Sequence, residues 1–149
     1  MEKKDLPQSF RLVIDNIIGQ NLEGTLHCFT EDGSFRDPSG SWQGKDGLRT
    51  FFTVGFHSTR DTVWEVRQWF QEDNLLCVEW TYGFTLSAGP FKDKKTLFDG
   101  LSIVELREGK IHRWRDYWDS ADFLQQVGAK KWGEVIPPDL IAHFFQKVP

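Results

Sequence analysis

The chain is poor in cysteine, in long apolar runs and in net positive charge. Its two cysteines, Cys28 and Cys77, form no CxxC pair and lie within apolar runs. This pattern is typical of buried free thiols in proteins of a reducing compartment. No apolar run approaches the roughly 18 residues of a membrane span. The N-terminus, MEKKDLPQSF, lacks the apolar region of a signal peptide. We therefore expect a soluble cytoplasmic protein without a membrane partner.

Positive charge and cofactor motifs are equally scarce. The net charge is −4 and the sequence pI is about 5.5, which argues against nucleic acid as a partner. The sequence has no G-x-G-x-x-G, no phosphate-binding G-x-x-x-x-G-K-[ST] and no G-x-S-x-G. Its four histidines are scattered and form no HExxH. We expect no cofactor, no metal and no acyl-enzyme.

Aromatic residues, in contrast, are abundant. The 149 residues include seven Trp and thirteen Phe, more than packing alone usually requires. Large rings also line apolar pockets, so the composition favours a ligand cavity. The length suits one domain, which we expect to span residues 1–149.

The order of the predicted elements indicates an α+β domain. Apolar spacing predicts helices over 8–18 and 45–56 and a short helical turn over 21–29. Residues 31–33 read as a turn before a short strand, 34–37, which Pro38 ends. Four further strands are expected over 63–71, 75–86, 96–107 and 109–119. Ser120 is expected to cap a last helix, 121–127, that Gly128 ends.

The last strand, GKIHRWRDYWD, carries the strongest chemical signal. Because side chains alternate along a strand, one face should carry His112, Trp114, Asp116 and Trp118. The other face should carry Ile111, Arg113, Arg115 and Tyr117. A carboxylate between indole rings is poorly solvated, which raises its pKa and suits it to acid–base catalysis. The alternatives are that Asp116 forms an ion pair with a neighbouring arginine, or that Asp119 is only the carboxylate at the helix entry.

Two other side chains are candidates for the same chemistry. Asp37 precedes Pro38, and it is either a second acid or a turn residue that bonds local backbone amides. Tyr82 shares a face of its strand with Trp80 and Phe84, and it either donates to a developing oxyanion or bonds a backbone carbonyl. The aromatic neighbours are either cavity walls or ordinary core.

The segments FTEDGSFRDPSGSWQGKDGLRTFF (29–52), GLSIVELREGKIHRWRDYWD (100–119) and SADFLQQVG (120–128) resemble the NTF2-like superfamily, in particular its SnoaL-like branch. The resemblance covers about residues 8–128 and leaves 129–149 as an extension. It implies a cone-shaped fold, in which a curved mixed or antiparallel sheet and N-terminal helices enclose an apolar cavity. We expect a homodimer formed through the open sheet face.

The resemblance also implies roles for particular residues. Asp37-Pro38 resembles the Asp-Pro that carries the base of ketosteroid isomerases, and Asp116 resembles the last-strand aspartate of polyketide cyclases and limonene-type epoxide hydrolases. The isomerase oxyanion-hole positions fall on Val13 and Ser102 here. The Arg and second Asp of the hydrolases fall on Trp80 and Tyr82. The polyketide cyclase pattern is thus contradicted least.

The resulting hypothesis is a cofactor-independent acid–base enzyme of cyclase, isomerase or dehydratase type that acts on a small hydrophobic molecule. Its catalytic residues would be Asp116, Asp37 and Tyr82. Its substrate-binding residues would be Trp80, Phe84, Trp114, Trp118, Phe35, Ser102 and Val13. The alternative is a non-catalytic module of the same fold that binds a hydrophobic ligand or a partner protein.

Overall fold

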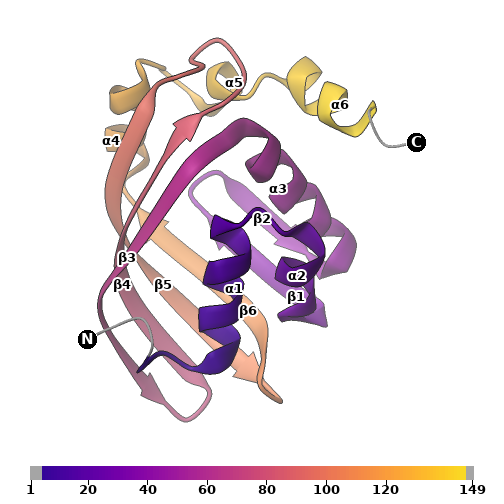
Figure 1. Ribbon diagram of the computed structural model, residues 1–149, viewed down its shortest axis with the longest axis vertical. Coiled ribbons are helices and arrows are strands. Elements are labelled where there is room, and N and C mark those ends of the chain that lie inside the picture. Colours follow the sequence, from indigo (N-terminus) through magenta and orange to yellow (C-terminus); the bar gives the residue numbers. More distant parts are fainter. Residues whose placement is uncertain (1–4, 147–149) are drawn as a thin grey trace.

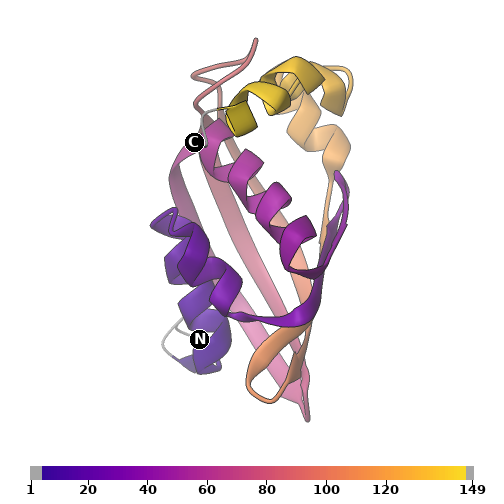
Figure 2. The same ribbon diagram turned by 90° about the vertical axis from the view of Figure 1, so that its right-hand side faces the viewer.

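A bent six-stranded sheet frames the molecule, with helices on its concave side (Figure 1, Figure 2). The computed structural model describes residues 5–146. The strands are β1 (Phe29–Asp37), β2 (Gly40–Gln43), β3 (Thr59–Glu72), β4 (Leu75–Leu86), β5 (Lys95–Arg107) and β6 (Lys110–Trp118). The helices are α1 (Gln8–Ile18), α2 (Leu22–His27), α3 (Gly44–Ser58), α4 (Ser120–Val127), α5 (Trp132–Val135) and α6 (Pro138–Gln146). The α+β class is confirmed.

The sheet order is β2-β1-β6-β5-β4-β3. Strands β3 to β6 form the expected antiparallel meander, whereas β1 runs parallel to β6 and makes the sheet mixed. Helices α1 and α3 lie against the concave face, and α4 to α6 gather at one end of it (Figure 1). Within residues 5–146, no helix is long and apolar enough to cross a membrane.

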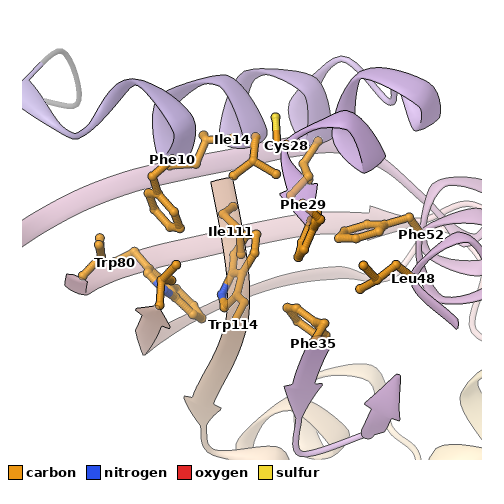
Figure 3. Packing of buried hydrophobic residues seen from close by; sticks show 14 of the residues in the cluster. Phe10, Ile14, Cys28, Phe29, Phe35, Leu48, Phe52, Trp80, Ile111 and Trp114 are labelled. Carbon is orange, nitrogen blue, oxygen red and sulfur yellow. The ribbon is translucent and has the colours of Figure 1, made fainter. Parts of the chain in front are cut away.

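The amphipathic helices follow the predicted pattern. In α1 the buried residues are Phe10, Val13, Ile14 and Ile17, which recur at helical spacing. In α3, Leu48 and Phe52 are buried and turn toward the same core (Figure 3). The helices are thus fixed to the sheet by the apolar stripes that the sequence shows.

The first strand is longer than predicted. Residues 31–33 are not a turn but part of β1, whose pairing with β6 is irregular between Phe29 and Ser34. A Cβ at Gly33 would approach the Thr30 carbonyl oxygen to 3.0 Å, so a glycine suits this irregularity. The turn-like residues therefore mark a distortion inside a strand. The short strand β2, which pairs with β1 after Pro38, was not predicted from the sequence.

Strand β6 departs from strict alternation at His112. Glu105 pairs with Arg113 but Leu106 pairs with Ile111, so His112 is the extra residue of a β-bulge. Ile111 is consequently buried on the same side as Trp114 (Figure 3). The prediction that His112 shares the face of Asp116 is wrong, because the bulge turns its ring toward the Thr30 hydroxyl, 3.2 Å from Nδ1. The placement of Trp114 beyond the bulge is as expected.

Candidate active site

A cavity of about 530 Å³ opens between the concave face of the sheet, α3 and the C-terminal helices. Three polar side chains predicted as catalytic line it together: Asp37 at the end of β1, Tyr82 in β4 and Asp116 in β6. Nearly half of the remaining wall residues are aromatic. They include Phe35, Trp42, Phe51, Phe52, Phe56, Trp64, Trp80, Phe84, Phe98, Trp114, Trp118, Phe123 and Trp132.

The carboxyl group of Asp116 is held at one oxygen. Its Oδ1 accepts a hydrogen bond from the Ser102 hydroxyl and another from the Trp114 indole Nε1, each at 2.5 Å. The pairing of β5 with β6 sets Ser102 directly opposite Asp116, which makes the first contact possible. Among the described residues, none donates to Oδ2, so this oxygen is available to a molecule in the cavity.

Burial raises the pKa of Asp116 to about 7, and the nearby charge of Asp37 adds to this effect. The hydrogen bonds from Ser102 and Trp114 act in the opposite direction because they stabilise the ionised form. Both protonation states of Asp116 are therefore populated near neutral pH. Such a group can take up a proton and return it, as general acid–base catalysis requires.

A glycine makes room for the donor behind Ser102. Trp80 Nε1 donates to the Ser102 hydroxyl oxygen at 2.8 Å, deep in the core. Trp80 pairs with Gly100 across β4 and β5, and a Cβ at Gly100 would overlap the Trp80 ring. The bare backbone at Gly100 thus lets the indole lie against β5 and reach Ser102, which in turn donates to Asp116.

Asp37 faces the cavity from the end of β1. Its Oδ1 accepts hydrogen bonds from Ser39, from the backbone N at 2.7 Å and the hydroxyl at 2.5 Å. These are the local turn contacts that the sequence before Pro38 suggested. Burial nevertheless raises the pKa of Asp37. Asp37 therefore has both of the properties that the sequence left as alternatives: it belongs to the turn and it lines the cavity.

Tyr82 is a neutral donor in an apolar setting. Burial raises its pKa, and the charge of Asp116 raises it further. The phenol therefore keeps its proton at physiological pH. Its ring lies among those of Trp64, Phe84 and Phe98, with centroid separations of 5.5 to 5.7 Å.

The seven predicted substrate-binding residues also have clear positions. Phe35, Trp80, Phe84, Trp114 and Trp118 line the cavity, while Ser102 lies behind Asp116 and contacts it without being part of the lining. Val13 does not line the cavity: it is fully buried in the core face of α1. The prediction for Val13 is wrong because the face of α1 that carries it packs into the core instead of facing the cavity.

The alternatives for the carboxylates of β6 are resolved by their contacts. Arg113 pairs with Glu105, and Asp116 forms no ion pair among the described residues. Asp119 is the N-cap of α4, since its Oδ1 accepts from the backbone N of Ala121 and Asp122 at 3.0 and 3.1 Å. The helix-entry reading of Asp119 is confirmed. The predicted cap, Ser120, is instead the first residue of the helix.

The C-terminal extension supplies one part of the cavity wall that was not predicted from the sequence. Trp132 stacks on Phe123 at 4.9 Å and 11°, and it meets Trp118 edge to face at 5.6 Å. Val135, Ile136, Pro138 and Ile141 extend the apolar wall. The only signal in the sequence was a Trp followed by an apolar segment, 140–145, outside the resemblance.

The cysteines and the candidate metal ligands of the described residues complete the survey of reactive side chains. Cys28 and Cys77 are both free, Cys28 buried and Cys77 half-buried. In the part of the chain that the structure describes, no group of three or more His, Cys, Asp or Glu side chains could hold a metal ion.

Comparison with known proteins places this geometry in a family. The model of the SnoaL-like domain matches residues 10–114, which is most of the chain. The chain belongs to the SnoaL-like family. Among curated proteins none matches. The resemblance to the NTF2-like superfamily is thereby confirmed, and solved structures agree with it.

Three solved structures illustrate this similarity. A hypothetical protein with a ketosteroid isomerase-like fold from Catenulispora acidiphila, in complex with trimethylamine, is 16% identical with a TM-score of 0.73, covering 83% of this chain and 95% of its own. A putative polyketide cyclase from Xanthomonas campestris is 14% identical with a TM-score of 0.69, covering 80% and 93%. An epoxide hydrolase of the LEH-like type from M. tuberculosis is 14% identical with a TM-score of 0.68, covering 81% and 87%. At these identities the likeness shows the fold, and the activity must be argued from the site.

Proposed function

We propose that this SnoaL-like protein is a cofactor-independent acid–base enzyme of cyclase, isomerase or dehydratase type, acting on a small hydrophobic molecule in the aromatic cavity. The observation that carries the proposal is the carboxyl group of Asp116, which faces an apolar cavity with one free oxygen and a pKa of about 7. Putative polyketide cyclases and an epoxide hydrolase share the fold, which supports a catalytic use of it.

The reaction begins when ionised Asp116 removes a proton from a carbon next to a carbonyl group. A C–H bond breaks, an O–H bond forms at Oδ2, and the electron pair moves to the carbonyl oxygen to give an enolate. Return of the proton to another carbon completes an isomerisation. Attack of the enolate carbon on a second carbonyl, whose oxygen then takes the proton, completes a cyclisation. Loss of a β-hydroxyl, protonated by Asp116 as it leaves as water, completes a dehydration.

Tyr82 and Asp37 are the partners of Asp116 in this proposal. The protonated Tyr82 phenol donates a hydrogen bond to the developing enolate oxygen. Asp37 shares the cavity with Asp116, and repulsion between two carboxylates favours a state in which only one is ionised. One protonated and one ionised carboxyl group is an arrangement suited to acid–base work.

Deuterium exchange tests the proposal without knowledge of the natural substrate. Proton nuclear magnetic resonance follows the α-protons of enolisable aromatic ketones such as 2-tetralone in D₂O with the wild-type protein, with Asp116→Asn and with Asp119→Asn as the matched control. A positioned base contributes about 10²–10⁴-fold, so we expect Asp116→Asn to lose at least about 100-fold of the catalysed exchange. The control should match the wild type because Asn is also a good helix cap. Wild-type exchange in Asp116→Asn would disprove the assignment.

Binding without turnover is the second candidate. It is favoured by the neutral character of the donors near Asp116: the described cavity wall offers Tyr82 and hydroxyl groups but no cationic side chain to an oxyanion. Carboxyl ¹³C signals of Asp116 distinguish the two functions. Titration near 7 supports the catalyst, and titration near the ordinary value of about 3.9 supports the binding module.

Self-association through the convex face of the sheet forms part of the proposal. Leu97 is 58% exposed and Tyr117 is 47% exposed on this face, and exposed apolar side chains of this kind are typical of protein–protein contact surfaces. Sedimentation equilibrium of the wild type and of Tyr117→Glu tests it: we expect a dimer that the substitution weakens. A wild-type protein that stays monomeric at 100 times the protein concentration used in the exchange assay would contradict it.

We also propose a reducing, cytoplasmic location for the protein, which the two free cysteines support.

A further inference from the structure

The charge of the cavity wall is entirely of one sign. Asp37 and Asp116 are the acidic residues of the wall, and no Lys, Arg or His lines it within residues 5–146. The basic side chains that form ion pairs do so elsewhere on the molecule, as Arg60 does with Asp93 and Arg49 with Glu23. A molecule that enters the cavity therefore meets negative charge and no opposing cation.

Neither carboxyl group of the cavity is neutralised by the protein. Asp116 accepts from Ser102 and Trp114, and Asp37 accepts from Ser39, but every one of these donors is uncharged. Buried carboxylates are usually paired with a cation, because their removal from water is otherwise expensive. When either carboxyl group is ionised, its charge has no cationic partner in the described wall, so a ligand is the remaining source of a counter-charge.

The rings beside these carboxyl groups are suited to the same kind of ligand. Almost half of the lining residues are aromatic, and the face of an aromatic ring attracts a cation electrostatically. Trp118 lies two residues beyond Asp116 on the same side of β6 and contacts Phe98 at 5.0 Å. An alkylammonium group is large, weakly hydrated and able to touch several rings at once, whereas a carboxylate or phosphate would be repelled by Asp37 and Asp116.

We propose that the cavity selects an apolar ligand bearing one positive charge, a protonated or quaternary amine, whose charge lies against Asp116 and the surrounding ring faces. The inference rests on the proposed function in that it concerns the same site and names its substrate class. A positive charge on the substrate also serves the chemistry, because it offsets the negative charge that moves from Asp116 to the enolate oxygen. Anionic carboxylates and phosphate esters are excluded as substrates.

Three probes of similar shape test this charge preference. Benzyltrimethylammonium carries the charge, neopentylbenzene is its neutral isostere, and phenylacetate is an anion of related size. Their affinities are measured by calorimetry or tryptophan fluorescence at pH 8.5 and pH 5.5. The proteins are the wild type, Asp116→Asn, Asp37→Asn and the control Asp119→Asn. The titratable groups that face the bound charge are Asp116, Asp37 and Tyr82, of which Tyr82 stays neutral throughout this range.

We expect benzyltrimethylammonium to bind the wild type at pH 8.5 at least about tenfold more tightly than neopentylbenzene, since the ionised carboxyl group of Asp116 and the ring faces both attract its charge. This advantage should shrink at least threefold at pH 5.5 and in Asp116→Asn, and it should persist in Asp119→Asn. Phenylacetate should bind most weakly. Equal or tighter binding of neopentylbenzene at both pH values overturns the inference, as does a cation preference that is as large in Asp116→Asn as in the wild type.

The outcome is independent of the test for catalysis. If ketone exchange depends on Asp116 but the neutral probe is preferred, the enzyme proposal stands and the cationic ligand does not. If cation binding depends on Asp116 but no probe or ketone undergoes exchange, the ligand class stands and the enzyme proposal does not.

Discussion

The Ser102 hydroxyl lies 2.5 Å from Asp116 Oδ1 across the β5–β6 pair, and it is also the acceptor for the indole N–H of Trp80 at 2.8 Å. A hydroxyl has a single proton, so the bond from Trp80 leaves Ser102 free to direct that proton at the carboxyl group. Trp114 Nε1 donates to the same carboxyl oxygen. The Asp116 side chain is therefore oriented by neutral donors that hold Oδ1 and present Oδ2 to the cavity.

Replacement of Ser102 by Ala should raise the pKa of Asp116 above 7. The variant removes a donor that stabilises the ionised carboxylate and leaves the buried Trp80 N–H without an acceptor. We expect the free energy of unfolding to fall by about 1–3 kcal/mol. The matched control is Thr96→Val, which loses a hydroxyl of the same strand that bonds the Phe84 carbonyl. Carboxyl ¹³C titration that shows the same pKa in Ser102→Ala and wild type would refute this role.

The pH dependence of stability should differ between the wild type and Asp116→Asn. In the folded protein Asp116 keeps its proton up to about pH 7, whereas the unfolded chain releases it near 3.8. Between these values the folded state binds more protons, so its stability decreases as pH rises from about 4 to 7 and is level above that. Burial of the ionised Asp116 carboxylate therefore lowers the free energy of unfolding by at most about 4 kcal/mol, because each unit of pKa shift corresponds to about 1.4 kcal/mol.

Asp116→Asn should therefore be more stable than the wild type at pH 8 and gain little at pH 5. Denaturation by urea at both pH values measures the difference. Asp119→Asn, which removes a charge three residues away, should differ from the wild type in stability by the same amount at both pH values. A wild type whose stability increases between pH 5 and 8 by more than that of Asp116→Asn would contradict the sign.

Gly100→Ala should disturb the site from behind. A Cβ at this position would overlap the Trp80 ring, so the indole must shift away from Ser102. Overpacking of this kind typically destabilises a protein by about 1–3 kcal/mol. Gly55→Ala is the control, because a Cβ there meets nothing within 4 Å and Ala favours a helix. Chemical denaturation and the Trp80 indole N–H resonance are the measurements; an unshifted resonance in Gly100→Ala would argue against this account.

Trp132→Ala should open the end of the cavity that α5 closes. The substitution removes the ring that stacks on Phe123 and meets Trp118. We expect a loss of about 1–3 kcal/mol in stability and faster quenching of the remaining tryptophans by acrylamide, because solvent reaches the cavity wall. Trp132→Phe is the reference, since it lacks the indole but keeps a ring. Identical quenching in the two variants would show that α5 does not shield the cavity.

The sequence predicts most of the elements because their signals are local. The apolar spacing of α1 and the alternation of β4 appear at nearly the predicted bounds. The cavity-facing position of Asp116 also follows from alternation within the last five residues of β6. These features depend on residues a few positions apart, which a single sequence displays directly.

The remaining features depend on contacts between distant segments. The parallel pairing of β1 with β6 turns the residues 31–33 into a strand distortion, although their composition is that of a turn. Likewise, nothing near Trp132 in the sequence indicates that it packs on Phe123. The donor chain from Trp80 through Ser102 requires strand register and the space above Gly100, neither of which can be obtained from spacing alone.

The extra residue at His112 has a consequence for how this strand tolerates change in length. Upstream of it Ile111 points to the core, and downstream of it the inward positions are occupied by Trp114 and Asp116. Deleting His112 would leave Ile111, Trp114 and Asp116 in strict alternation on the core face. A strand of the present length without the bulge would instead turn Arg113 and Arg115 inward along with Ile111, and the cavity would exchange its acid for cations without any substitution in its wall. In this protein the bulge between the core anchor and the carboxylate determines the electrostatic sign of the cavity as firmly as the identity of residue 116 does.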